Sequence, residues 1–137
     1  MDIIEFSAAD FLRLGLELAG FSEHRQHRTT YATNLRRFRA HFYASPASCA
    51  GIFSDLQTTD IAEARIDGKP SPIYLLMALN WLKQYSVEEE LAERFKLVEK
   101  TARKWTQLYT QKVQALKAAK VSTATTTHKY FEYTNLF

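Results

Sequence analysis

The feature that most constrains the fold is the stretch between Val87 and Lys120, which contains neither proline nor glycine. Because these two residues interrupt helices most strongly, their absence predicts a helical stretch with at most a short turn. Placing residues 99–118 on a helical wheel, at about 100° per residue, separates two faces. One face is apolar and consists of Ala102, Trp105, Tyr109, Val113 and Leu116. The opposite face is polar and consists of Lys100, Lys104, Gln107 and Gln111, with Arg103 and Gln114 beside them.

One interpretation of this stretch is a helix-turn-helix over residues 86–118. Ser86 and Glu89 match a capping box, which predicts the start of a first helix. The turn then falls around Lys96, at a cost of about 1–2 kcal/mol if this residue adopts a left-handed conformation. Val98 stands where the second helix would prefer Ser, Thr, Asp or Asn as its cap.

The alternative interpretation is one continuous helix over residues 88–118 that pairs with a partner helix. Its apolar residues alternate in spacing between four and three, as they do along a coiled-coil seam. The seam consists of Leu91, Phe95, Val98, Ala102, Trp105 and Tyr109. Spacing alone leaves both interpretations open.

Composition favours one small all-α domain in a chain of 137 residues, since only 4 are glycine and 3 are proline. The single Cys49 excludes an intramolecular disulfide and is typical of a reducing, intracellular compartment. No apolar run approaches the roughly 20 residues that span a bilayer, so we expect no membrane partner.

Turn and cap residues divide the rest of the chain into segments. Ser-Pro pairs at Ser45 and Ser71 predict helix starts, because proline suits the first helical position. The helix over 71–85 is apolar nearly all round, which predicts a buried central helix that supports the following segment. The expected organisation is an N-terminal helix within 1–22, a helical domain over 23–120 that includes a long helix at 23–43, and an irregular tail at 121–137, disordered or docked.

Basic side chains form two blocks that alternate with acidic ones. Residues 94–120 carry eight basic side chains against Glu99 alone, and residues 23–45 carry five arginines against Glu23. Clustered positive charge of this kind suits a polyanion. Three arginines of the earlier block are candidates for phosphate contacts, although they would equally solubilise an amphipathic helix: Arg36, Arg37 and Arg39. The histidines form no cluster with Cys or carboxylates, so we expect no metal and no cofactor.

Three segments carry a resemblance to a known family: FRAHFYASPASCAGIFSDLQTTDIAEARI, YLLMALNWLKQYSVEEELAERF and EKTARKWTQLYTQKVQALKAAK. Together they resemble the N-terminal region of Harbinger-like DDE transposases over roughly residues 23–120. The resemblance implies an all-helical DNA-binding region with a helix-turn-helix. The residues that match the start of its recognition helix are Lys100, Thr101, Arg103 and Lys104. Lys96 and Val98 depart from the family, which has glycine and a Ser-like cap there.

In such transposases a catalytic domain follows, in which three carboxylates bind two metal ions. After Val121 the only acidic residue is Glu132, so no such triad can be assembled. We therefore expect a DNA-binding module of a truncated or domesticated transposase-like protein, nuclear and without catalytic activity. Its partner is double-stranded DNA, contacted through Lys100, Thr101, Arg103, Lys104, Gln107 and Gln111. The alternative is a helical interaction or oligomerisation protein, for example a homodimer, built on the continuous helix.

Overall fold

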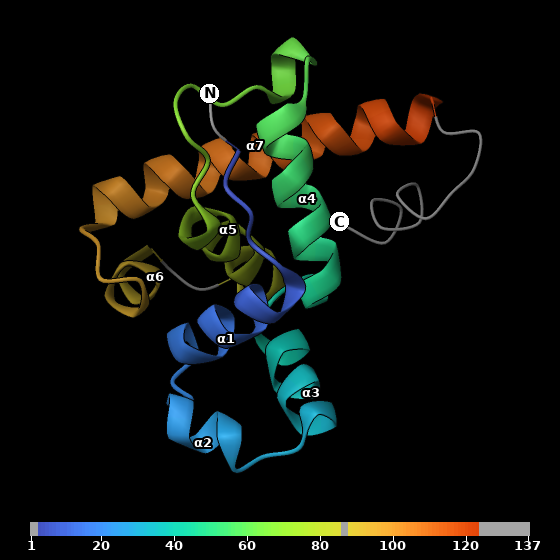
Figure 1. Ribbon diagram of the computed structural model, residues 1–137. Coiled ribbons are helices and arrows are strands. Elements are labelled where there is room, and N and C mark those ends of the chain that lie inside the picture. Colours follow the sequence, from blue (N-terminus) through green and yellow to red (C-terminus); the bar gives the residue numbers. More distant parts are fainter. Residues whose placement is uncertain (1–2, 86–87, 124–137) are drawn as a thin grey trace.

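A computed structural model describes residues 3–85 and 88–123 of the chain (Figure 1). Within these residues the chain forms α-helices and one short 3-10 helix, and contains no strand, which confirms the all-α class. The elements are α1 (Ala8–Leu18), α2 (Glu23–His27), α3 (Tyr31–His41), α4 (Pro46–Thr58), η1 (Ala62–Ala64), α5 (Pro72–Gln84), α6 (Glu88–Arg94) and α7 (Glu99–Thr123). The predicted start of an irregular tail at Val121 is wrong, because α7 continues to Thr123. The rest of the predicted tail, residues 124–137, and the predicted cap at Ser86 lie outside the described residues.

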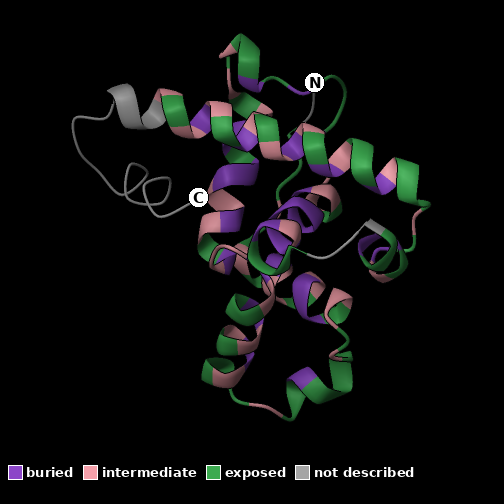
Figure 2. Ribbon diagram, turned by 180° about the vertical axis from the view of Figure 1, so that it is seen from behind, coloured by how far each residue is buried: buried purple, intermediate pink, exposed green. Residues whose placement is uncertain are grey.

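Helix α5 is the centre of the molecule, as its sequence predicts. Every residue from Leu75 to Asn80 is buried, and α5 packs against α1, α3, α4 and α7 (Figure 2). The helix begins at Pro72, and the Ser71 hydroxyl caps it by accepting a hydrogen bond from the Tyr74 backbone N–H. Because α7 makes its most extensive contacts with α5, this buried helix is the support on which α7 rests.

Helix α1 packs into the same core and is not a separate unit. Ser7 and Asp10 form a capping box at its start, and these hydrogen bonds, chiefly those from Ser7, lower the pKa of Asp10. Phe11 and Leu16 are fully buried. Gly15 allows close approach of α3, because a Cβ atom there would lie 2.3 Å from Cε2 of Phe38.

The expectation of one long helix over 23–43 is wrong, because the chain breaks between α2 and α3. The hydroxyl of Thr30 accepts a hydrogen bond from the Thr33 backbone N–H and so starts a new helix. Across the break, Nδ2 of buried Asn34 donates to the Gln26 carbonyl, and Nε2 of Gln26 donates to the Phe21 carbonyl. These polar contacts hold α2 at an angle to α3, and Tyr31, the first residue of α3, is 68% exposed.

The continuous-helix interpretation is also wrong, because α6 ends at Arg94 and α7 begins at Glu99. Lys96 adopts the left-handed conformation at φ 57°. The Leu97 N–H donates to the Ala92 carbonyl and the Lys96 N–H to the Glu93 carbonyl, at 2.8 and 3.2 Å. This pattern is a Schellman motif, which ends α6 and turns the chain, with lysine at the position where glycine is usual.

Candidate nucleic-acid interface

The candidate site is the solvent-exposed face of α7. Five of the predicted contact residues are exposed along it: Lys100, Arg103, Lys104, Gln107 and Gln111. Thr101, the sixth, is half-buried, and Gln114 extends the exposed row toward the end of the helix. Along the helix, the exposed face therefore begins with basic side chains and continues with a row of amide side chains.

The opposite face of α7 is anchored by aromatic contacts to α5. The Trp105 ring stacks on the ring of Tyr74, with 4.8 Å between centroids and 12° between planes. Tyr109 is 1% exposed, and its hydroxyl accepts a hydrogen bond of 2.7 Å from the Ser71 backbone N–H. Burial raises the pKa of Tyr109, although the Ser71 N–H acts in the opposite direction, so the phenol is neutral near neutral pH. These contacts fix the rotation of α7 about its own axis, and hence the side chains it presents.

Two basic side chains, Lys112 and Arg94, hold the neighbours of α7 in place. Nζ of Lys112 donates to the Glu63 carbonyl at 3.0 Å and ties α7 to η1. On the other side, Nη1 of Arg94 donates to Oδ1 of Asn80 at 2.6 Å and to Oε1 of Gln84 at 3.1 Å. Asn80 is 1% exposed, so this bond satisfies a buried acceptor and fixes the end of α6 on α5. The angle between α6 and α7 is thereby set by α5.

The charged side chains of α7 are almost all basic. Across Glu99–Thr123 the sequence has six basic residues, and Glu99 is the only acid. Val98 precedes the helix with 68% of its surface exposed, and its carbonyl accepts the hydrogen bond from the Ala102 N–H. Nζ of Lys104 lies 5.0 Å from the centre of the Trp105 ring, so part of the positive charge rests on an aromatic face.

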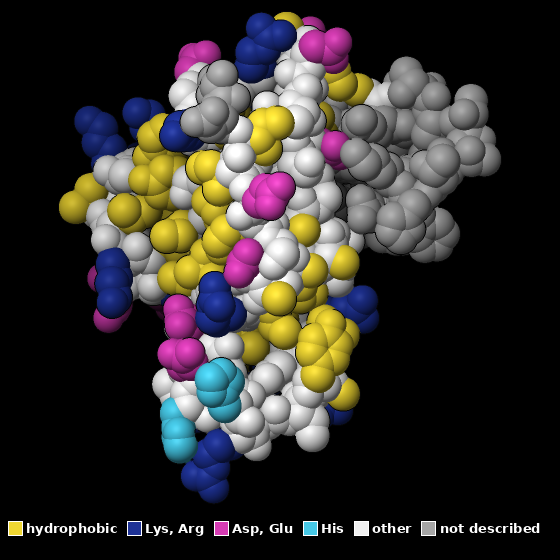
Figure 3. Space-filling model, in the orientation of Figure 1, with side chains coloured by type: hydrophobic (Ala, Val, Ile, Leu, Met, Phe, Trp, Pro, Cys, Tyr) yellow, Lys and Arg dark blue, Asp and Glu magenta, His cyan; other side chains and the backbone are white. Residues whose placement is uncertain are grey.

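The arginines of α3 lie on a different part of the molecule from the exposed face of α7. Helices α2 and α3 form one end of the fold and α7 crosses the other, as Figures 1 and 2 both show. Figure 3 shows basic side chains toward the start of α7 and at the α2 end, with acidic and further basic side chains over the middle of the face. Arg36 and Arg39 are exposed, whereas Arg37 lies 4.6 Å from the centre of the Phe21 ring and donates to Thr29. Arg37 is therefore a packing residue of the α1–α3 corner.

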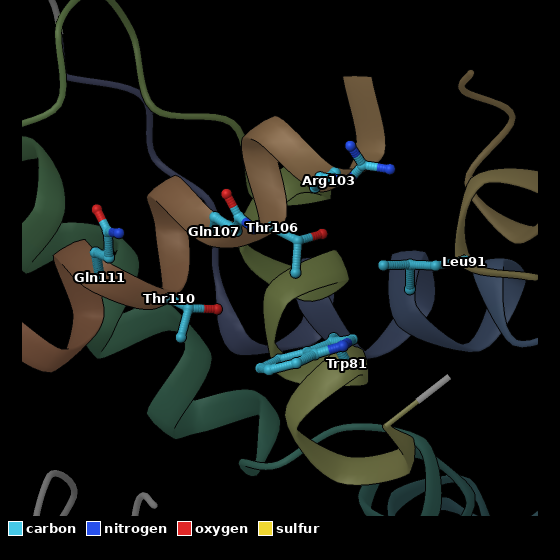
Figure 4. A pocket seen from close by; sticks show the side chains of 7 residues that line it. All are labelled: Trp81, Leu91, Arg103, Thr106, Gln107, Thr110 and Gln111. Atoms are coloured by element: carbon cyan, nitrogen blue, oxygen red, sulfur yellow. The ribbon is translucent and has the colours of Figure 1, made fainter. Parts of the chain in front are cut away.

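Sequence reasoning missed a pocket of about 230 Å³ beside the exposed face. It lies between α5, α6 and α7, and Figure 4 shows Thr106 and Thr110 projecting from α7 toward Trp81. Its lining residues are Trp81, Leu91, Arg103, Thr106, Gln107, Thr110 and Gln111. The two threonines lie between the polar and apolar faces of the helical wheel, so nothing in the pattern distinguished them.

The described part of the chain contains no group of three or more His, Cys, Asp or Glu residues arranged to hold a metal ion. Cys49 is fully buried, and desolvation raises the pKa of its thiol far above the usual range. Its thiol is therefore protonated at neutral pH and packs as a small apolar side chain. Among the described helices, none combines the length and apolar character needed to cross a membrane.

Comparison of this chain with protein-family models, with curated proteins and with solved structures found no match. The resemblance to Harbinger-like transposases thus remains an interpretation of the sequence. Function has to be argued from the surface of α7 itself.

Proposed function

We propose that this chain is a DNA-binding module in which the exposed face of α7 enters the major groove of double-stranded DNA. The observation that carries the proposal is the exposure of Lys100, Arg103, Lys104, Gln107 and Gln111 on one face of a helix whose other face is anchored in the core. At about 1.5 Å per residue this helix is roughly 37 Å long, and a major groove about 12 Å wide admits an α-helix.

The residue types suggest a division of roles along the helix. Lys100 and Lys104 carry point charges that suit phosphate oxygens, and Thr101 adds a hydroxyl for the same backbone. Arg103 can contact O6 and N7 of a guanine, whereas Gln107 and Gln111 can each pair with N6 and N7 of an adenine. Contacts to phosphates position the helix, and the amides further along it read the sequence.

The competing proposal is a helical interaction protein that pairs through the 88–118 seam. The burial of the seam residues argues against it. Leu91, Ala102 and Tyr109 are each 1% exposed or less, so this chain's own core already covers most of the seam. Val98, by contrast, is 68% exposed because it lies in the turn. No continuous apolar stripe along α6 and α7 is left for a partner helix.

The test compares two variants that remove the same charge from different surfaces. Binding to a labelled random-sequence duplex is measured by fluorescence anisotropy for Arg103→Ala/Lys104→Ala and for Arg36→Ala/Arg39→Ala. We expect the α7 variant to bind much more weakly, with the magnitude of the salt slope reduced by about one, because Lys104 is assigned to a phosphate and Arg103 to a base. The α3 variant should bind like the wild type. Equal effects of the two variants would refute the assignment of α7 as the contact surface.

A further inference from the structure

The loop between η1 and α5 contains an aspartate followed by a glycine, Asp67-Gly68, a pair that occurs once in the sequence. Asp67, Gly68 and Lys69 are all exposed. The residues on either side of them, Ile66 and Pro70, are buried and fix the two ends of the loop. The pair therefore lies in a short exposed segment between two buried anchors.

The side chain of an aspartate at this position can react with the main chain. When the Gly68 amide nitrogen attacks Cγ of Asp67, a C–N bond forms, and the amide hydrogen leaves with the carboxyl hydroxyl as water. The product is a five-membered succinimide ring. Water then opens the ring at either carbonyl carbon and gives aspartate again or isoaspartate, in which the main chain runs through Cβ and Cγ. The reaction needs no cofactor, oxidant or reductant.

The structure leaves the two reacting groups free. Gly68 has no Cβ atom to hinder the attack, it adopts φ 84°, and a Cβ atom placed there would meet nothing within 4 Å. Within residues 3–85 and 88–123, no hydrogen bond holds the Gly68 N–H, and no hydrogen bond or ion pair holds the Asp67 carboxylate. Attack on Cγ therefore breaks no contact of the fold.

The other Asp and Asn residues in the described part of the chain lack this combination. Asp60 is exposed, but it precedes Ile61, whose branched Cβ atom hinders attack by the amide nitrogen. Asp10 lies within α1, and its carboxylate accepts a hydrogen bond from the Ser7 N–H. Three more are buried within helices: Asn34, Asp55 and Asn80. Asp67 is thus the position among them at which the reaction should be fastest.

We propose that Asp67-Gly68 is a site of spontaneous isoaspartate formation in the folded protein. The product keeps the negative charge of residue 67 and lengthens the main chain between Ile66 and Pro70 by one methylene group. Its α-carboxylate becomes a side group, which is the group that S-adenosylmethionine-dependent isoaspartyl methyltransferases methylate. The loop is therefore a substrate for an enzyme of this class. This site does not depend on whether α7 binds DNA.

The test follows isoaspartate in the full chain, kept folded at physiological temperature and neutral pH. A purified isoaspartyl methyltransferase with labelled S-adenosylmethionine measures the amount, and electron-transfer fragmentation of the tryptic peptide that begins at Ile66 gives the position. Asp67→Glu keeps the charge, but its longer side chain would have to close a six-membered ring, which forms far more slowly. Asp60→Glu is the matched control, because Asp60 is also an exposed aspartate outside the α-helices.

We expect isoaspartate at residue 67 to accumulate with time in the wild type and equally in Asp60→Glu. In Asp67→Glu the signal from that peptide should be lost, while far-UV circular dichroism stays unchanged. Asp67→Asn should convert faster than the wild type, because a carboxylate has to be protonated before its hydroxyl leaves, whereas an amide releases ammonia. Isoelectric focusing of this folded variant should show the gain of a negative charge.

Two results would overturn the proposal. The first is the absence of isoaspartate at residue 67 in the folded wild type; accumulation only in urea would mean that the folded loop holds the Gly68 nitrogen away from Cγ. The second is equal conversion at Asp60 and Asp67 in the folded wild type, since the glycine and the open loop would then give residue 67 no advantage.

Discussion

Lys96 offers a direct test of the turn that separates α6 from α7. The residue is exposed and has φ 57°, a conformation that glycine adopts readily and that a Cβ atom disfavours by about 1–2 kcal/mol. The informative comparison is between Lys96→Gly and Lys96→Ala. Both remove the ammonium group, and they differ only in the Cβ atom.

In the turn, Lys96→Gly should be more stable than Lys96→Ala. Removal of the left-handed strain contributes about 1–2 kcal/mol, and the greater freedom of glycine in the unfolded chain offsets about 0.5–1 kcal/mol of it. The expected net gain is about 0.5–1 kcal/mol, or about 2–3 °C in Tm for a chain of this length. In a continuous helix the sign reverses, because glycine in a helix interior costs about 1 kcal/mol relative to alanine.

The assay is urea unfolding followed by far-UV circular dichroism, with equal m-values required before the free energies are compared. If Lys96→Ala proves more stable than Lys96→Gly, the chain does not turn at Lys96, and the α7 surface has to be reassigned. The two variants should bind duplex DNA equally, since Lys96 is exposed in the turn and is not one of the predicted contact residues.

Three further predictions concern the support of α7 and the core. Arg94→Ala should lower the free energy of unfolding by about 1–3 kcal/mol, since it leaves Oδ1 of buried Asn80 without its donor, and urea unfolding with Arg94→Lys as a partial rescue tests this. Gly15→Ala should destabilise by about 1–3 kcal/mol, because its Cβ meets Phe38, and Phe38→Leu in the same chain should recover part of the loss. The thiol of Cys49 should react with a disulfide reagent only on unfolding. Because its folded pKa is raised, the unfolded thiol ionises first, so this group should lower stability as pH rises above about 8.5, compared with Cys49→Ala.

Much of the local structure could be predicted from the sequence, because its signals act within a few residues. Ser45-Pro46 and Ser71-Pro72 start α4 and α5 as expected, and Gly20 ends α1 with φ 100°. The two faces of α7 also follow from side-chain spacing, since burial of one stripe on a helix exposes the other.

The break between α2 and α3 shows where such signals fail. Thr29 and Thr30 are compatible with a helix interior as well as with a cap, so the sequence from 23 to 43 could continue as one helix. The hydrogen bonds from Asn34 to the Gln26 carbonyl and from Gln26 to the Phe21 carbonyl stabilise a bend between α2 and α3 instead of one continuous helix. Those contacts join residues that come together only when α1 packs on α3.

By itself, then, the sequence determined the helical class, the caps and the amphipathic division of α7, because these depend on periodicity and on neighbouring residues. Only the tertiary structure decided that the arginines of α3 lie at the other end of the fold from α7. It also decided that Thr106 and Thr110 face Trp81 across a pocket. The physical reason is that both arrangements depend on how helices distant in sequence pack around α5, and spacing along the chain carries no information about the angles between them.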